Sequence, residues 1–137
     1  MVKYPHKFVC VSLLCYICIM EKIRTVITYK DYFDNFLSKQ SPKVQQKIMQ
    51  RLRIIEQIER IPTTYLKYIE DTNGLFEIRI NFASDIFRVF CFFDNGKLVV
   101  LLSGFQKKTQ KTPREEIKRA ERLMVEYYNE KKENEKH

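Results

Sequence analysis

The feature that most constrains the fold is a series of three strand-like segments separated by short turns. Apolar residues, many of them β-branched or aromatic, dominate residues 75–81, 86–93 and 97–103, and Asn95-Gly96 between the last two segments is typical of a two-residue hairpin turn. Strands joined by so few residues pair antiparallel, because a parallel pair needs a crossover connection of about a dozen residues or more. The sequence therefore predicts an antiparallel sheet on which the remaining segments pack.

Two helix starts precede these strands. Residues 28–31 resemble a capping box and predict a short helix, and Ser41-Pro42 predicts a second helix with the serine as its N-cap. Apolar residues of the second helix recur three and four positions apart, at Val44, Ile48, Leu52 and Ile55. This helix is expected to stop near Ile61, because the proline that follows restricts the residue before it. The two helices should form a hairpin.

A last helix is predicted after the strands. Residues 112–115 resemble a capping box with proline at the first helical position, and one apolar stripe follows, made of Ile117, Ala120, Met124 and Tyr127. The Lys/Glu-rich residues from Asn129 onward are expected to fray. With a short strand over residues 23–28, the predicted order is β-α-α-β-β-β-α. This is an α+β fold in which an antiparallel sheet packs on a helical hairpin.

The chain of 137 residues has the length of one domain, expected over residues 20–128, with a charged tail over residues 129–137. Residues 1–19 form a hydrophobic leader that is too short to span a bilayer and that no cleavage site follows. Either the leader is an added strand or anchor, or translation starts at Met20. The change of composition at this point favours Met20, which predicts a cytoplasmic protein that does not associate with a membrane.

The cysteines do not form a pattern that binds metal. No second cysteine pair or histidine set completes a zinc site, so we expect ordinary apolar residues in a reducing compartment at Cys10, Cys15, Cys18 and Cys91. No metal or cofactor is expected elsewhere in the chain.

The turns also predict the register of the sheet. A two-residue turn at Asn95-Gly96 places Arg88 opposite Ser103, and a four-residue loop before Ile86 places Arg79 opposite Arg88. One sheet face then carries the apolar residues that cover the helices. The other face carries a polar group, Glu77, Arg79, Arg88 and Ser103, and beside it an apolar patch of Phe90, Phe92, Val99 and Leu101. The last helix or a partner protein has to cover that patch.

Two arginines directly opposite each other repel, so they need solvent or a bridging anion between them. Guanidinium groups bind phosphate through two parallel hydrogen bonds, and the net charge of +8 also favours a polyanionic partner. Lys107 and Lys108 follow closely enough to reach the same place. The alternative interpretation is a solvated polar face in which Glu77 forms an ion pair with an arginine, Arg79 being the expected partner.

Three ordered motifs resemble the RelE/ParE superfamily of toxins from type II toxin–antitoxin systems. Residues 74–79 read GLFEIR and residues 87–90 read FRVF, which resemble two successive strands of that superfamily. Residues 99–118 read VVLLSGFQKKTQKTPREEIK, which is similar to the signature of the phage-derived, HigB-like subgroup. The resemblance covers about residues 20–128.

The resemblance implies a RelE-like fold and an endoribonuclease that cleaves mRNA on the ribosome without a metal. In such a reaction the 2′-hydroxyl of the RNA attacks the adjacent phosphate, which requires cations at the phosphate and groups that transfer protons. By the same resemblance, the expected catalytic residues are Arg79, Arg88 and Lys108. The expected substrate-binding residues are Lys107, Ser103, Glu77 and Lys111.

The chain departs from several relatives because it has no histidine near the site; its two histidines are His6 and His137. Either Glu77 or a lysine with a lowered pKa would then accept the proton, or catalysis would rest on positioning by the ribosome. The expected partners are a cognate antitoxin of the helix-turn-helix type, the ribosome and mRNA. Two other functions stay open: inhibition of DNA gyrase, as in ParE-like toxins, and nucleic-acid binding without catalysis, which basic residues with interleaved aromatics would also support.

Overall fold

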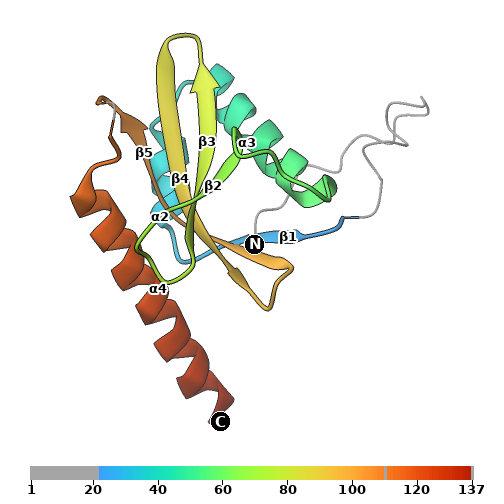
Figure 1. Cartoon of the computed structure of the whole chain (residues 1–137), viewed down its shortest axis with the longest axis vertical. Helices are drawn as coiled ribbons and strands as arrows, with labels where there is room; N and C mark the ends of the chain where they lie inside the picture. The colour runs from blue at the N-terminus through green and yellow to red at the C-terminus, as the bar shows by residue number, and fades with distance from the viewer. Residues whose placement is uncertain (1–21, 110, 137) are drawn as a thin grey trace.

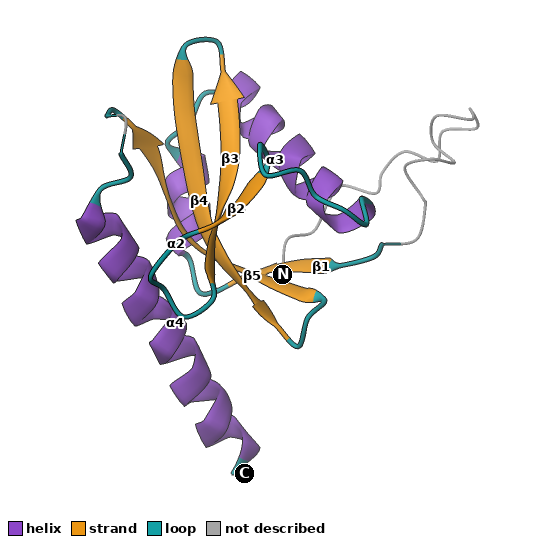
Figure 2. Ribbon diagram, in the orientation of Figure 1, coloured by secondary structure: helices purple, strands orange, loops and turns teal. Residues whose placement is uncertain are grey.

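The computed structural model describes residues 22–109 and 111–136, and these residues form a five-stranded sheet with helices on both faces (Figures 1 and 2). The elements in chain order are β1 (Thr25–Thr28), α2 (Tyr32–Ser38), α3 (Pro42–Gln57), β2 (Leu66–Tyr68), β3 (Leu75–Phe82), β4 (Asp85–Asp94), β5 (Leu98–Lys107) and α4 (Arg114–Glu135). The predicted α+β class is confirmed. The predicted leader, both histidines and the first three cysteines lie outside the described residues.

The sheet has the strand order β1-β5-β4-β3-β2. Its three long strands form the predicted antiparallel meander, but the sheet is mixed, because β1 runs parallel to β5 at one edge. A parallel pair needs a long connection between its strands. Two helices and three strands lie between β1 and β5 in the chain, so the connection is long enough. The short strand β2, which we did not predict, pairs with β3 at the opposite edge.

The helical hairpin packs on one face of the sheet through α2 and α3, and α4 covers part of the other face (Figure 2). The start of α3 is confirmed, since the Ser41 hydroxyl accepts a hydrogen bond from the Val44 amide at 3.3 Å. Its end comes earlier than predicted, because Ile58 is already extended and the side chain of Arg24 binds carbonyls of the last turn. No described helix is both long and apolar enough to cross a membrane.

Both predicted capping boxes are wrong. The backbone of Thr28 still belongs to β1, and Lys30 has a positive φ, so α2 begins only after Asp31. At α4 the N-cap is Pro113, and no side chain caps the helix. In both places a tertiary contact competes for the threonine: a sheet ladder in the first case and a carboxylate in the second.

The register between β3 and β4 is as predicted, with Arg79 opposite Arg88, whereas the register between β4 and β5 is not. Asp94 pairs with Leu98, so the turn holds three residues. A β-bulge then places both Leu102 and Ser103 opposite Phe90, and Arg88 therefore lies opposite Phe105. The carbonyl of Lys97, the last residue of this turn, accepts a hydrogen bond from the Thr25 amide of β1 at 3.0 Å.

Because one residue of slip turns side chains to the other face, the predicted faces of β5 are reversed between the turn and the bulge. Val99 and Leu101 pack against α2 and α3, and Val100 and Leu102 pack against α4. All four residues of the predicted apolar patch are buried, Phe90 and Phe92 under the last helix and Val99 and Leu101 under the helical hairpin.

Helix α4 continues through Glu135, so the predicted fraying from Asn129 is wrong. The predicted stripe packs on the sheet, and polar contacts hold the end of the helix. The Tyr127 hydroxyl donates to Asp94 at 2.7 Å, and the Lys131 ammonium group lies 2.9 Å from the same carboxylate. Lys30 forms ion pairs with Glu126 and Glu130 one turn apart. These polar contacts stabilise the last turns of α4, which have few apolar residues to pack on the sheet.

Candidate nucleic-acid interface

The α4 side of the sheet carries a cluster of four cations next to the segment that leads into α4. We call Lys67, Arg79, Arg88 and Lys107 the cationic cluster. Register explains how the fold assembles it: Arg79 is opposite Arg88, and Lys67 is opposite Glu77. Lys107 ends β5, and the charges of Arg88, Glu77, Arg79 and Lys67 all act on it. Four strands thus contribute to one place on the sheet.

Arg88 is the centre of the cluster and is only 3% exposed. Its Nη1 donates to the carbonyl of Phe87 at 2.9 Å, and its Nε lies 3.6 Å from Glu77 Oε2. Burial, and then the charge of Arg79, lower the pKa of Arg88, while Glu77 opposes this change. The fold therefore holds a guanidinium that has lost its water and is incompletely paired. The Nε of Arg79 is likewise buried and has no hydrogen-bond partner.

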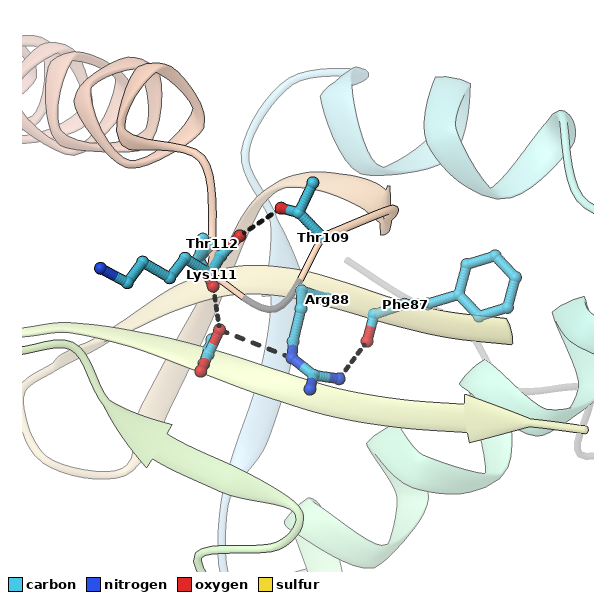
Figure 3. A network of polar contacts seen from close by, with 6 residues as sticks. Phe87, Arg88, Thr109, Lys111 and Thr112 are labelled. Carbon is cyan, nitrogen blue, oxygen red and sulfur yellow. Dashed lines mark hydrogen bonds and ion pairs between the residues drawn. The ribbon is translucent and has the colours of Figure 1, made fainter. Parts of the chain in front are cut away.

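Glu77 is the carboxylate among these cations, and it is itself buried. Its Oε2 also accepts a hydrogen bond from the Thr112 hydroxyl at 3.3 Å, which links the sheet to the segment that enters α4 (Figure 3). We had expected Glu77 to form an ion pair with Arg79, but its partner is Arg88. Arg79 is left with an unbalanced charge. One carboxylate among four cations leaves the cluster strongly positive.

The surroundings of Lys107 favour the loss of its proton. Burial, and then the charge of Arg88, lower its pKa, while Glu77 raises it and Arg79 and Lys67 lower it further. A larger fraction of its amino group is therefore neutral near neutral pH than in a free lysine. A neutral amine beside two guanidinium groups can accept a proton, and its conjugate acid can return one.

Three predicted site residues do not join the cluster. Lys108 is exposed and follows the last residue of β5. Lys111 is exposed, its carbonyl accepts a hydrogen bond from the Thr109 hydroxyl at 2.8 Å, and its side chain extends away from Arg88 (Figure 3). Ser103 is buried in a separate pocket beside α2, because the longer turn and the bulge move it along β5 away from Arg88.

Sequence reasoning missed Lys67 and Thr112. Lys67 lies on a strand of three residues that has no clear periodic pattern, so no sequence signal placed it beside Glu77. Thr112 carried a misleading signal, since its spacing to Glu115 is that of a capping box. Only the distance from Thr112 to Glu77 in the folded chain identifies its actual partner.

The cluster is suited to bind a phosphate group. An anion between Arg79 and Arg88 would relieve their repulsion and supply the hydrogen-bond acceptors that their Nε atoms lack. Among the described residues, no group of three or more metal-ligating side chains gathers anywhere. Cys91 is fully buried, and burial raises the pKa of its thiol, so it is not a nucleophile.

Comparison with known proteins gives a family match and a structural likeness. Residues 35–125 match the family described as "Phage derived protein Gp49-like (DUF891)". The RelE–RelB complex of the archaeon Pyrococcus horikoshii OT3 contains a chain that is similar to this one with a TM-score of 0.46 and 18% identity. The alignment covers 60% of the present chain and 92% of the other. No curated protein sequence matches the chain.

Proposed function

The chain belongs to the phage-derived Gp49-like family (DUF891), and we propose that it is the toxin of a toxin–antitoxin pair, an endoribonuclease that cleaves mRNA on the ribosome. The observation that carries this proposal is the buried, incompletely paired Arg88 opposite Arg79, with Lys107 beside them. The motifs that hold these residues are those that resemble RelE/ParE toxins.

The proposed reaction is a transesterification within the RNA chain. The 2′-oxygen bonds to the adjacent phosphorus, the bond from phosphorus to the 5′-oxygen of the next nucleotide breaks, and a cyclic phosphate and a 5′-hydroxyl result. Negative charge grows on the phosphoryl oxygens in the transition state. Arg79 and Arg88 would stabilise that charge, because the sheet holds them opposite each other, with the Arg88 side chain buried and the Nε of Arg79 buried without a partner.

Two protons move in this reaction, one from the 2′-hydroxyl and one to the leaving 5′-oxygen. We assign proton transfer to Lys107, in place of the predicted Lys108, since the pKa of Lys107 is lowered and its charge is coupled to both arginines. Glu77 is assigned a positioning role, because its carboxylate already holds Arg88 and the Thr112 hydroxyl. Lys67 would bind the phosphate of a neighbouring nucleotide.

The partners in this proposal are the ribosome, its mRNA and an antitoxin of the helix-turn-helix type, and the protein would act in the cytoplasm. These assignments rest on the motif resemblance and on the positive site. The antitoxin would neutralise the toxin by covering the cationic cluster or the helical hairpin.

The test is a purified translation system programmed with a defined mRNA. The protein is expected to cut this mRNA when ribosomes are present, to leave naked RNA intact, and to keep its activity in EDTA. Growth arrest with intact mRNA and blocked replication would instead indicate a gyrase inhibitor. Binding to RNA without cleavage on the ribosome would indicate a nucleic-acid-binding module.

A further inference from the structure

A second polar pocket lies beside the cationic cluster, between α2, the bulge of β5 and the first turns of α4. It has a volume of about 260 Å³ and includes Tyr32, Asn35, Lys39, Ser103 and Arg119 in its wall. Helix α2 supplies three of these side chains, β5 supplies the serine and α4 supplies the arginine. Segments that are far apart in the sequence therefore meet at one small opening.

The floor of the pocket contains a polar group that lacks a partner. Ser103 is 2% exposed, and its hydroxyl makes no hydrogen bond to any described residue. A buried hydroxyl without a partner costs free energy, so native proteins nearly always provide one. Ser103 is one of the residues that line the pocket, so a ligand with an acceptor oxygen held there would lie next to this hydroxyl.

The rim of the pocket is positively charged. Lys39 ends α2, and the Arg119 guanidinium lies 5.6 Å from the centre of the Tyr32 ring, whereas none of the lining residues is acidic. Cations at the rim and a hydroxyl donor at the floor match the needs of a phosphate group. The volume also suits a group of that size rather than a folded peptide.

The pocket and the cationic cluster are aligned along β5. Ser103 and Lys107 are four residues apart, which is about 13 Å at the rise of a strand. This length corresponds to roughly four nucleotides at the axial rise of a duplex strand, and to fewer nucleotides in an extended single strand. Between the two sites lies Phe105, which is partly exposed and stacks on Phe90 at 5.4 Å, so it offers an aromatic surface on which a base could lie.

We infer that the pocket of Ser103, Lys39 and Arg119 is a second phosphate-binding subsite, which holds the RNA backbone a few nucleotides from the bond that is cut. The inference rests on the proposed ribonuclease function and deepens it. Two phosphate subsites separated by an aromatic surface would align the strand so that one chosen phosphate reaches Arg79 and Arg88.

The direct test is an NMR titration with a 2′-O-methyl octanucleotide, which cannot be cleaved because the attacking hydroxyl is blocked. The amide signals of Ser103 and Gly104 are expected to shift with this probe. A dinucleotide at equal concentration should shift mainly the signals of the cationic cluster, and inorganic phosphate serves as the probe for the isolated anion. Ser103→Ala should fold normally, because the substitution removes a hydroxyl that has no partner.

The variant Lys39→Ala/Arg119→Ala should bind the octanucleotide about tenfold more weakly. The slope of log affinity against log salt should also become shallower by about 0.7, the value for one phosphate of a single strand. The matched control is Lys43→Ala/Lys118→Ala, which removes the same charge from α3 and α4, close in the sequence to Lys39 and Arg119. Its lysines line other grooves of the surface, so its affinity should stay close to that of the wild type.

Three results would overturn the inference. The first is that neither the octanucleotide nor inorganic phosphate shifts the pocket signals. The second is that phosphate shifts these signals and the octanucleotide does not, which assigns the pocket to a free phosphorylated molecule. The third is that both double variants bind equally. If the wild-type protein still cleaves mRNA on ribosomes in these cases, the proposed function stands. If the pocket binds the octanucleotide but no cleavage occurs, the subsite stands and the proposed function fails.

Discussion

Replacing Arg88 by methionine tests whether its buried charge serves catalysis or folding. Methionine keeps most of the side-chain volume and removes the guanidinium group. The loss leaves Glu77 without its ion pair, and breaking a buried pair typically costs about 3–5 kcal/mol. Here the cost should be smaller, because Glu77 keeps the Thr112 hydroxyl and the remaining cations of the cluster, and the repulsion between Arg79 and Arg88 disappears.

We therefore expect the free energy of unfolding to fall by no more than about 1 kcal/mol, which corresponds to a change in Tm of about 4 °C for a domain of this size. Cleavage on the ribosome should fall by at least about a hundredfold, the usual effect of removing one donor that stabilises a transition-state oxyanion. Arg88→Lys should recover little activity, since an ammonium group cannot form two parallel hydrogen bonds to phosphate.

The assay pairs thermal unfolding with single-turnover cleavage of ribosome-bound mRNA, calculated per folded molecule. The double variant Glu77→Gln/Arg88→Met is the control, because it removes both members of the ion pair and leaves no unpaired carboxylate. If Arg88→Met melts many degrees lower, is rescued by the second substitution and keeps its specific activity, then Arg88 is structural and the assignment of the phosphate site is refuted.

Three further predictions concern other parts of the molecule. Lys107→Arg keeps the charge but cannot lose its proton, so the cleavage rate should drop and no longer rise with pH, whereas a wild-type pH profile would exclude Lys107 as the proton acceptor. Burial raises the pKa of Asp94, but hydrogen bonds from Lys131 and Tyr127 outweigh it, and the pKa ends below its ordinary value of 3.8. Chemical denaturation should accordingly show that Asp94→Asn is less stable than the wild type by about 1–2 kcal/mol at pH values above 3.8. The difference should vanish as the pH falls through the pKa of Asp94 in the folded protein, and a difference that does not depend on pH would contradict this. Gly104→Ala would place a Cβ 2.5 Å from the Phe36 ring and should cost about 1–3 kcal/mol, with partial rescue by Phe36→Leu in the same unfolding assay.

The elements whose signal is local were predictable. Ser41-Pro42 marks the start of α3 because serine capping and proline at the first turn depend only on adjacent backbone. The pairing of Arg79 with Arg88 was predictable for a related reason, since a short connection between two long strands leaves little freedom of register. The two arginines of the proposed site could therefore be identified before the structure was known.

The tertiary structure decided which other groups stand beside those arginines. The turn at Asn95 holds one residue more than predicted, its last carbonyl binds β1, a strand about seventy residues earlier in the chain, and the bulge at Ser103 added a second shift. Together they replaced Ser103 by Phe105 opposite Arg88. Lys67 lies in the cluster on a strand that is too short to show a periodic pattern. The Thr112 hydroxyl donates a hydrogen bond to Glu77 and does not cap α4. Each of these outcomes depends on a contact between segments that are distant in the chain. Local sequence patterns do not predict such contacts.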